Sequence, residues 1–213
     1  MRPSTIDHLA DRAVARTVAT RRAEFGAEMR RIADATFALI ERTGSLDPSM
    51  REILAETGLS TQAFYRYFSS KDELMLALLD EGRRRLVDTL RKRMARAAGA
   101  PDQVRAWIEG VLAQAANPTA AARTRPWVLS EARLTELFPV EQHASVGLLV
   151  ALLHEPLARL GTTTRSHDDI DRIATMIYQL TFATLRTHLV SGTKPGSKEA
   201  EALIGFCLRG ATA

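Results

Sequence analysis

The residues from Thr61 to Arg66 carry side chains that can read the edges of nucleic-acid bases. Thr61, Gln62 and Arg66 supply hydroxyl, amide and guanidinium groups. Groups of these kinds form hydrogen bonds with base edges in the major groove of DNA. Ala63 is small enough to allow close approach or to contact a thymine methyl group. The stretch therefore predicts a surface that binds DNA through its bases.

Neighbouring residues have the chemistry of phosphate contacts. Tyr65 and Tyr67 carry hydroxyl groups at a reach suited to phosphate oxygens, although Tyr67 fits a half-buried position equally well. Lys71 places a cation where the next helix is expected to begin, beside free backbone N–H groups. The DNA-contacting residues predicted from the sequence are Ser60, Thr61, Gln62, Ala63, Tyr65, Arg66, Tyr67 and Lys71.

A helix-turn-helix is the element that would position these side chains. The turn Gly58-Leu59-Ser60 separates two short apolar-periodic segments, and Phe64 and Phe68 share the inward face of the second. In such a unit the second helix enters the major groove. Spacing alone leaves open a helical corner that touches no DNA. The helices of this unit are expected over residues 23–43, about 49–58, and 61–68.

The start of the middle helix has two candidate caps. Asp47 followed by Pro48 is one arrangement. Ser49 with Glu52 three residues later forms a capping box and is the other.

The residues from about Ile32 to Leu79 resemble the DNA-binding domain of TetR-family transcriptional regulators. The resemblance rests on "IADATFALIERTG", on "MREILAETGLS" and above all on "AFYRYFSSKDEL". It implies an all-α chain with a C-terminal helical domain that binds a small effector and forms a homodimer. It also implies a role as a regulator, most often a repressor, that binds a pseudo-palindromic operator in double-stranded DNA.

Composition and charge agree with a protein of this kind. Hydrophobic residues make up 46% and charged residues 25%, and the residue types favour helices throughout. Residues 1–96 hold 18 Lys and Arg against 14 Asp and Glu, whereas residues 97–213 hold 11 of each. The basic half is the one expected to meet DNA. We expect a cytoplasmic protein, because there is one cysteine, no signal pattern and no uncharged run long enough for a membrane span.

The N-terminal 20 residues are expected to form a loose arm or an extra helix. Arginines there could follow the DNA backbone or enter the minor groove, or they could belong to a solvated face balanced by acidic residues. The expected organisation is an arm over residues 1–20, a helix-turn-helix domain over 21–70, and an effector and dimerisation domain over 71–213. The arginines of the arm are Arg2, Arg12, Arg16, Arg21 and Arg22.

The second half is read as five further helices after the long one that begins at Lys71. Apolar and aromatic residues on them could line a cavity, although most could equally fill the core. Such a lining suits a hydrophobic or aromatic effector, whose binding is expected to release the repressor from its operator. The helices are expected over residues 102–116, 126–138, 140–160 with a kink or end at Pro156, 168–191 and 197–210. The candidate effector-binding residues are Trp107, Trp127, Phe138, His143, Met176, Tyr178, Gln179 and Phe182.

Two apolar stripes near the C-terminus predict a four-helix dimer interface. They comprise Ile170, Ile173, Ile177, Leu180, Thr184 and His188 on one helix, with Leu203, Ile204, Cys207 and Leu208 on the last.

Catalytic and metal chemistry are not indicated. Five histidines are present, but no metal-ligand, nucleophile or phosphate-cradling motif accompanies them. We expect no enzyme activity and no cofactor. An architectural DNA-binding protein without an effector is the alternative hypothesis, and a ligand-binding enzyme that has lost DNA binding is a third.

Overall fold

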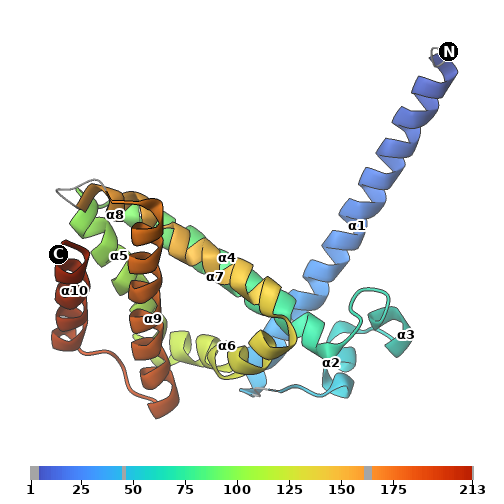
Figure 1. Ribbon diagram of the computed structural model, residues 1–213. Coiled ribbons are helices and arrows are strands. Elements are labelled where there is room, and N and C mark those ends of the chain that lie inside the picture. Colours follow the sequence, from blue (N-terminus) through green and yellow to red (C-terminus); the bar gives the residue numbers. More distant parts are fainter. Residues whose placement is uncertain (1–4, 45–46, 161–164, 213) are drawn as a thin grey trace. The chain divides into compact units, whose positions relative to one another are not determined.

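The computed structural model describes residues 5–44, 47–160 and 165–212, with side chains from Arg12 onward. The predicted all-α fold class is confirmed, because every regular element in these ranges is a helix (Figure 1). The elements are α1 (Thr5–Thr43), α2 (Met50–Thr57), α3 (Thr61–Phe64), α4 (Lys71–Met94), α5 (Ala100–Leu112), η1 (Ala113–Ala115), α6 (Pro118–Leu137), α7 (Pro139–Ala151), α8 (His154–Leu160), α9 (His167–Ser191) and α10 (Ser197–Thr212).

The chain forms two compact units. The first comprises α1 to α3 and the first turn of α4 through Leu74, and the second begins at Met75. Helix α4 is continuous across this division.

The core of the first unit is formed by apolar side chains from α1, α2 and the chain around α3. Ile32 and Ile40 on α1 are buried, as are Ile53 on α2 and both Phe64 and Phe68. Thr36 is buried too, and its hydroxyl donates to the Ile32 carbonyl 2.8 Å away, which satisfies that polar group within the helix. Helices α1 and α2 pack directly against each other.

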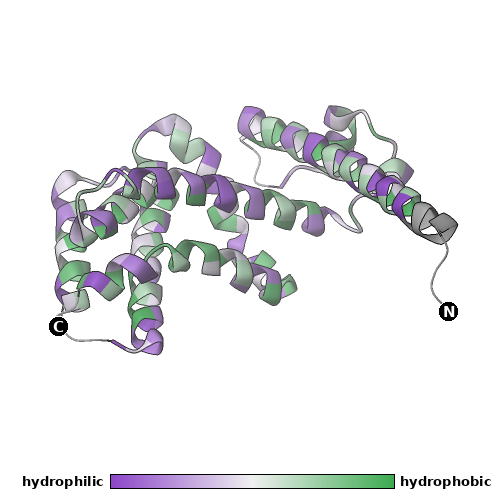
Figure 2. Ribbon diagram, turned by 90° about the horizontal axis from the view of Figure 1, so that it is seen from above, coloured by the Kyte–Doolittle hydropathy of each residue, from purple (hydrophilic) through white to green (hydrophobic). Residues whose placement is uncertain are grey.

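Helix α1 is longer than the helix expected over residues 23–43. The segment expected as an arm or extra helix continues it without a break, because Ala and Arg are strong helix formers and Gly26 alone does not interrupt them. All side chains from Arg12 to Phe25 are exposed. In Figure 2, hydrophobic and hydrophilic residues alternate along α1, the helix nearest the N-terminus. Arg2 lies outside the described residues.

The second unit is a helical bundle around one apolar core. Trp107, Ile108 and Val104 of α5 are fully buried, and Leu149 of α7 and Leu157 of α8 pack with them. Helix α9 contacts α5, α6, α7, α8 and α10, so it is the central element of this unit.

Two proline positions differ from the sequence expectation. Helix α6 begins at Pro118 rather than at residue 126, and Pro126 lies buried within it. Asn117 caps α6 by accepting a hydrogen bond from the Ala120 N–H 2.9 Å away, which sets the earlier start. Pro156 occupies the first turn of α8, where its missing N–H costs no helical hydrogen bond. The break between α7 and α8 therefore precedes the proline.

Candidate nucleic-acid interface and interior polar site

The helix-turn-helix is built from local capping interactions. Ser49 caps α2, and its hydroxyl and backbone N–H engage Glu52 in a capping box, so the second of the two predicted caps is the one observed. The hydroxyl and backbone hydrogen bonds from Ser49 lower the pKa of the Glu52 carboxyl. Gly58 ends α2 in the left-handed conformation at φ 69°, which a side chain would disfavour. Ser60 then caps α3 by accepting from the Ala63 N–H at 3.1 Å.

The recognition segment is a short α-helix that continues as tight turns. Helix α3 covers Thr61–Phe64, and backbone hydrogen bonds from Arg66 to Ala63 and from Tyr67 to Phe64 carry the chain on to Phe68. The ring centroids of Phe64 and Phe68 lie 5.7 Å apart in the core. The opposite side of the recognition segment therefore faces outward.

The outward side carries most of the predicted DNA contacts. Thr61, Gln62 and Arg66 are exposed, and Tyr65 keeps 53% of its surface accessible. Ser60 is exposed as well, although its oxygen already caps α3. The structure thus brings together hydroxyl, amide, phenol and guanidinium groups on one surface, which is the set of groups that reads base edges and phosphates.

The remaining predicted contacts are less accessible. Tyr67 is half-buried, and its ring packs against that of Phe25 with centroids 4.8 Å apart. Ala63 is half-buried too. Lys71 at the start of α4 forms an ion pair with Asp47, and 22% of its side chain is accessible. Tyr67 therefore positions the segment on α1 at least as much as it presents a hydroxyl.

Helix α4 begins with its own cap. The Ser70 hydroxyl accepts from the Glu73 N–H at 3.0 Å, and the Glu73 carboxylate accepts from the Ser69 backbone N–H at 2.5 Å. These bonds fix the first turn of α4, and with it the position of Lys71.

This geometry coincides with a known domain. Residues 32–78 match the family model described as bacterial regulatory proteins, tetR family. This segment is a TetR-family N-terminal domain. The match spans α2, α3, the second part of α1 and the start of α4. The TetR-type domain therefore includes all the exposed residues described above.

Solved structures extend the likeness to the fold of the whole chain. A TetR transcriptional regulator from Rhodococcus sp. RHA1 has a TM-score of 0.67 at 16% identity, over 88% of this chain and 97% of that one. The fatty acid degradation regulator FadR from Bacillus halodurans gives 0.62 at 18%, over 87% and 95%. FadR from Bacillus subtilis in complex with stearoyl-CoA gives 0.61 at 17%, over 86% and 97%. No match was found among curated proteins.

The second unit contains a largely buried polar site beside its apolar core, which we call the interior polar site. It consists of Arg83 from α4, Glu131 from α6, Gln142 and Ser145 from α7, and Tyr178 from α9. Arg83 is 6% exposed and donates to Glu131 Oε1 at 2.5 Å and to Gln142 Oε1. Burial raises the pKa of Tyr178, the negative charge of Glu131 raises it further, and Arg83 opposes both.

Three of the predicted effector-binding residues meet beside this site. The rings of Tyr178 and Phe182 stack at 4.4 Å, and Phe182 lies 6.5 Å from Trp107. Trp127 is buried, and Phe138 is half-buried at the end of α6. We call Tyr178, Phe182 and Trp107 the aromatic row.

The other predicted effector-binding residues lie on the surface of the protomer. His143, Met176 and Gln179 are exposed, so they do not line an interior cavity. On α7, Gln142 and Ser145 face inward in place of His143, because the inward face of this helix follows residues 142, 145 and 149. Sequence reasoning missed Arg83, Gln142 and Ser145. The sequence signal that could have found them is a polar residue at helical spacing from apolar residues, which places it on the buried face of its helix.

The predicted dimer stripes are also largely corrected. Ile170, Ile177 and His188 on α9, and Ile204 and Cys207 on α10, are buried in the core of the protomer itself and cannot face a partner. Ile173, Leu203 and Leu208 pack partly buried against that core, and Thr184 is half-buried. Of the predicted stripes only Leu180 is exposed, at 40%. The exposed stripe of α9 instead comprises Met176, Leu180, Ala183, Thr187 and Val190.

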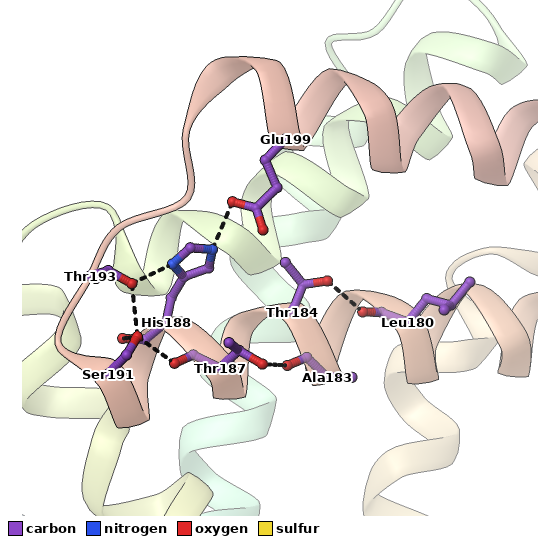
Figure 3. Close-up of polar contacts among 8 residues, drawn as sticks. All are labelled: Leu180, Ala183, Thr184, Thr187, His188, Ser191, Thr193 and Glu199. Carbon is purple, nitrogen blue, oxygen red and sulfur yellow. Dashed lines mark hydrogen bonds and ion pairs between the residues drawn. The ribbon is translucent and has the colours of Figure 1, made fainter.

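His188 has a structural role at the end of α9. Its Nε2 lies 2.8 Å from Glu199 of α10, and its Nδ1 lies 2.7 Å from the Thr193 hydroxyl, as Figure 3 shows. Ser191 completes the group through a 2.8 Å contact with Thr193. The network ties the turn after α9 to the first turn of α10.

A cavity of about 350 Å³ lies between the start of α6 and the end of α9. Small apolar residues line it together with Arg125 and Lys194. Arg125 Nη2 approaches the Val190 carbonyl at 3.5 Å, so this cation caps the carbonyl end of α9. Within the described ranges, no group of three His, Cys, Asp or Glu residues could hold a metal ion. None of the helices described is both long and apolar enough to cross a bilayer.

Proposed function

We propose that this protein is an effector-responsive transcriptional regulator that binds operator DNA through α3 and represses transcription. The observation that carries the proposal is the exposed group Thr61, Gln62, Tyr65 and Arg66, held outward by Phe64 and Phe68 within a segment that matches the TetR-family model. The excess of basic residues in the first half supports the same assignment, since it favours approach to a polyanion.

A homodimer would place two recognition segments on a pseudo-palindromic operator. The exposed apolar stripe of α9 and the exposed Phe206 of α10 support this arrangement, with Met176 at 56%, Val190 at 49% and Phe206 at 60% accessible. Apolar side chains gathered on two adjacent helices favour burial against a second copy. The proposed interface shares Leu180 with the predicted stripe and otherwise uses the neighbouring, exposed face of α9.

An effector bound in the second unit would control DNA binding through α4. This helix carries Lys71 in its first turn and Arg83 twelve residues later, so its sequence contributes to both units. One helix thus bears both a candidate phosphate contact and a component of the interior polar site. An effector that favours one position of α4 would shift the population of DNA-competent dimers. The stearoyl-CoA complex of FadR shows that a protein of this fold accommodates a small molecule.

Fluorescence anisotropy with labelled DNA tests the proposal. The probe is DNA from immediately upstream of the protein's own gene, compared with a scrambled sequence over a series of salt concentrations. A specific regulator should prefer the upstream DNA by a factor of about 10³ or more. Equal binding to both DNAs that vanishes with salt would indicate phosphate contacts alone, and an architectural protein without an operator.

A further inference from the structure

We propose that the interior polar site recognises an effector that is electrically neutral, presents a carbonyl-type oxygen acceptor and carries an aromatic or apolar body. This inference rests on the proposed function, in which the second unit binds an effector, and it specifies the chemical class of that effector. The donors that receive the oxygen are the Gln142 amide and the Ser145 hydroxyl. The aromatic row receives the body.

The first support is a pair of buried polar atoms that protein groups leave unsatisfied. Gln142 is 2% exposed and Ser145 is 3% exposed, yet Gln142 Nε2 and Ser145 Oγ have no hydrogen-bond partner among the described residues. An unsatisfied buried polar group costs about 1–3 kcal/mol. Because the residues stand three apart on α7, both atoms lie on one face of that helix.

The orientation of the Gln142 amide makes this face a donor. Its Oε1 accepts a hydrogen bond from Arg83 Nη1. Arginine has only donors, so the amide cannot be turned over without placing N–H against N–H. The Nε2 group is therefore the end left free, and it offers N–H to a ligand. A bound oxygen atom would satisfy it and could also accept from Ser145.

The charge state of the site specifies a neutral ligand. The Arg83 cation is already compensated by Glu131 at 2.5 Å, so an anionic ligand would add an uncompensated charge to the core. Tyr178 reports on the same environment. Burial and the nearby Glu131 raise the pKa of its hydroxyl despite the opposing Arg83, in agreement with an environment that disfavours a new negative charge.

The apolar requirement follows from the aromatic row. Trp107 Nε1 donates to the Leu149 carbonyl at 3.2 Å, so this ring offers surface and no further donor. Leu149 lies on the same face of α7 as Ser145, one turn further on. Tyr178 belongs both to the interior polar site and to the row, in which it stacks on Phe182. Donor atoms and ring surface therefore adjoin one another, as recognition of an aryl carbonyl compound requires.

A matched set of three small probes tests the ligand class. Acetophenone is neutral and carries one carbonyl oxygen, benzoate has similar size with a negative charge, and α-methylstyrene replaces the oxygen by a methylene group. Binding is measured with purified full-length protein at neutral pH without DNA, by tryptophan fluorescence titration and by the shift in melting temperature. Acetophenone should bind at least about ten-fold more tightly than either of the other probes, since each lacks neutrality or the acceptor.

Substitutions in α7 locate the binding. Ser145→Ala should weaken acetophenone binding several-fold and leave α-methylstyrene binding unchanged. His143→Ala, a neighbouring exposed position, should alter neither. Benzoate binding as tight as acetophenone binding, no binding of any probe, or full acetophenone affinity in Ser145→Ala would each overturn the inference. In the last two cases the polar pair serves only to hold water.

The DNA experiment and the probe experiment fail independently. Operator binding is read without any probe, and probe binding is read without DNA. Probe binding in a protein that shows no operator preference would reject the proposed regulatory function and support the ligand class of the interior polar site. Operator preference in a protein that binds no probe would support the proposed regulatory function and overturn the proposed ligand class.

Discussion

Lys71, the first residue of α4, forms an ion pair with Asp47, which precedes α2. The same ammonium group is a candidate phosphate contact, so the carboxylate of Asp47 and a DNA phosphate compete for it. Asp47 is the more exposed partner, with 69% of its side chain accessible against 22% for Lys71. DNA binding therefore has to displace or share an existing partner at this position.

Removal of the competing charge should strengthen DNA binding. For Asp47→Asn we expect affinity for DNA of any sequence to rise by up to about five-fold, the range of an exposed ion pair. Lys71→Met should weaken binding to any sequence and reduce the slope of log affinity against log salt by about one. Anisotropy titrations at several salt concentrations measure both effects. An unchanged slope in Lys71→Met would show that this lysine serves only its ion pair with Asp47.

Base-reading residues should behave differently from phosphate contacts. Gln62→Ala or Arg66→Ala should cost about 1–3 kcal/mol on the specific operator and much less on scrambled DNA, because a base contact is lost. Arg30→Ala, an exposed position on α1, serves as the matched control and should leave operator preference intact. Equal losses on both DNAs would assign Gln62 and Arg66 to the phosphate backbone.

The exposed stripe of α9 and α10 can be tested apart from DNA binding. Phe206→Lys, and separately Leu180→Glu, should shift the protein from dimer to monomer in sedimentation equilibrium, because a charge would then be buried at the interface. Val140→Lys is the control, since Val140 is 75% exposed and lies on α7. Circular dichroism should show unchanged helix content in all three variants. Dimers that survive both interface substitutions would place the interface elsewhere.

Two glycines of the second unit should respond oppositely to a methyl group. A Cβ on Gly110 of α5 would stand 2.4 Å from Leu90 Cδ2, and Leu90 is fully buried, so Gly110→Ala should lower the free energy of unfolding by about 1–3 kcal/mol. A Cβ on Gly147 of α7 meets open space, and Gly147→Ala should raise that free energy by up to about 1 kcal/mol. Urea unfolding of the two variants measures the contrast. A stabilised Gly110→Ala would mean that Leu90 repacks without cost.

Tyr178 predicts a loss of stability at high pH. Its folded pKa is raised above the ordinary value of 10.0, chiefly by burial. The unfolded chain therefore releases this proton at a pH where the folded protein retains it, so the contribution is complete below pH 10 and declines as pH rises beyond it. The free energy of unfolding, measured by urea titration across this range, should fall less steeply in Tyr178→Phe than in the unsubstituted protein. Identical slopes would contradict the burial of this hydroxyl.

Signals confined to a few consecutive residues predicted the first unit well. Gly58 at a helix end and Ser60 as a cap each act through neighbouring backbone groups, so sequence spacing is sufficient to locate the turn. The α-helical part of the recognition segment is nevertheless shorter than expected, because the chain tightens into turns after Phe64.

The second unit was harder because its signals depend on contacts between distant segments. Helix α9 is apolar on two faces, and the sequence alone does not say which face packs inside the protomer. Gln142 and His143 illustrate the same difficulty on α7. The two are adjacent polar residues, and only the packing of α7 decides that Gln142 faces inward. The partnership of Arg83 with Glu131 joins positions 48 apart, which no local pattern encodes.

Pro126 has a mechanical consequence for α6. A proline has no N–H, so the Ala122 carbonyl lacks the donor that position 126 would otherwise supply, and the ladder of helical hydrogen bonds is interrupted there. The turns before the proline adjoin the cavity at the end of α9, whereas those after it carry Glu131 of the interior polar site. The turn around Pro126 therefore has fewer backbone hydrogen bonds than the turns on either side of it. Amide hydrogens in the turn around Pro126 should exchange with solvent faster than those in the flanking turns of α6.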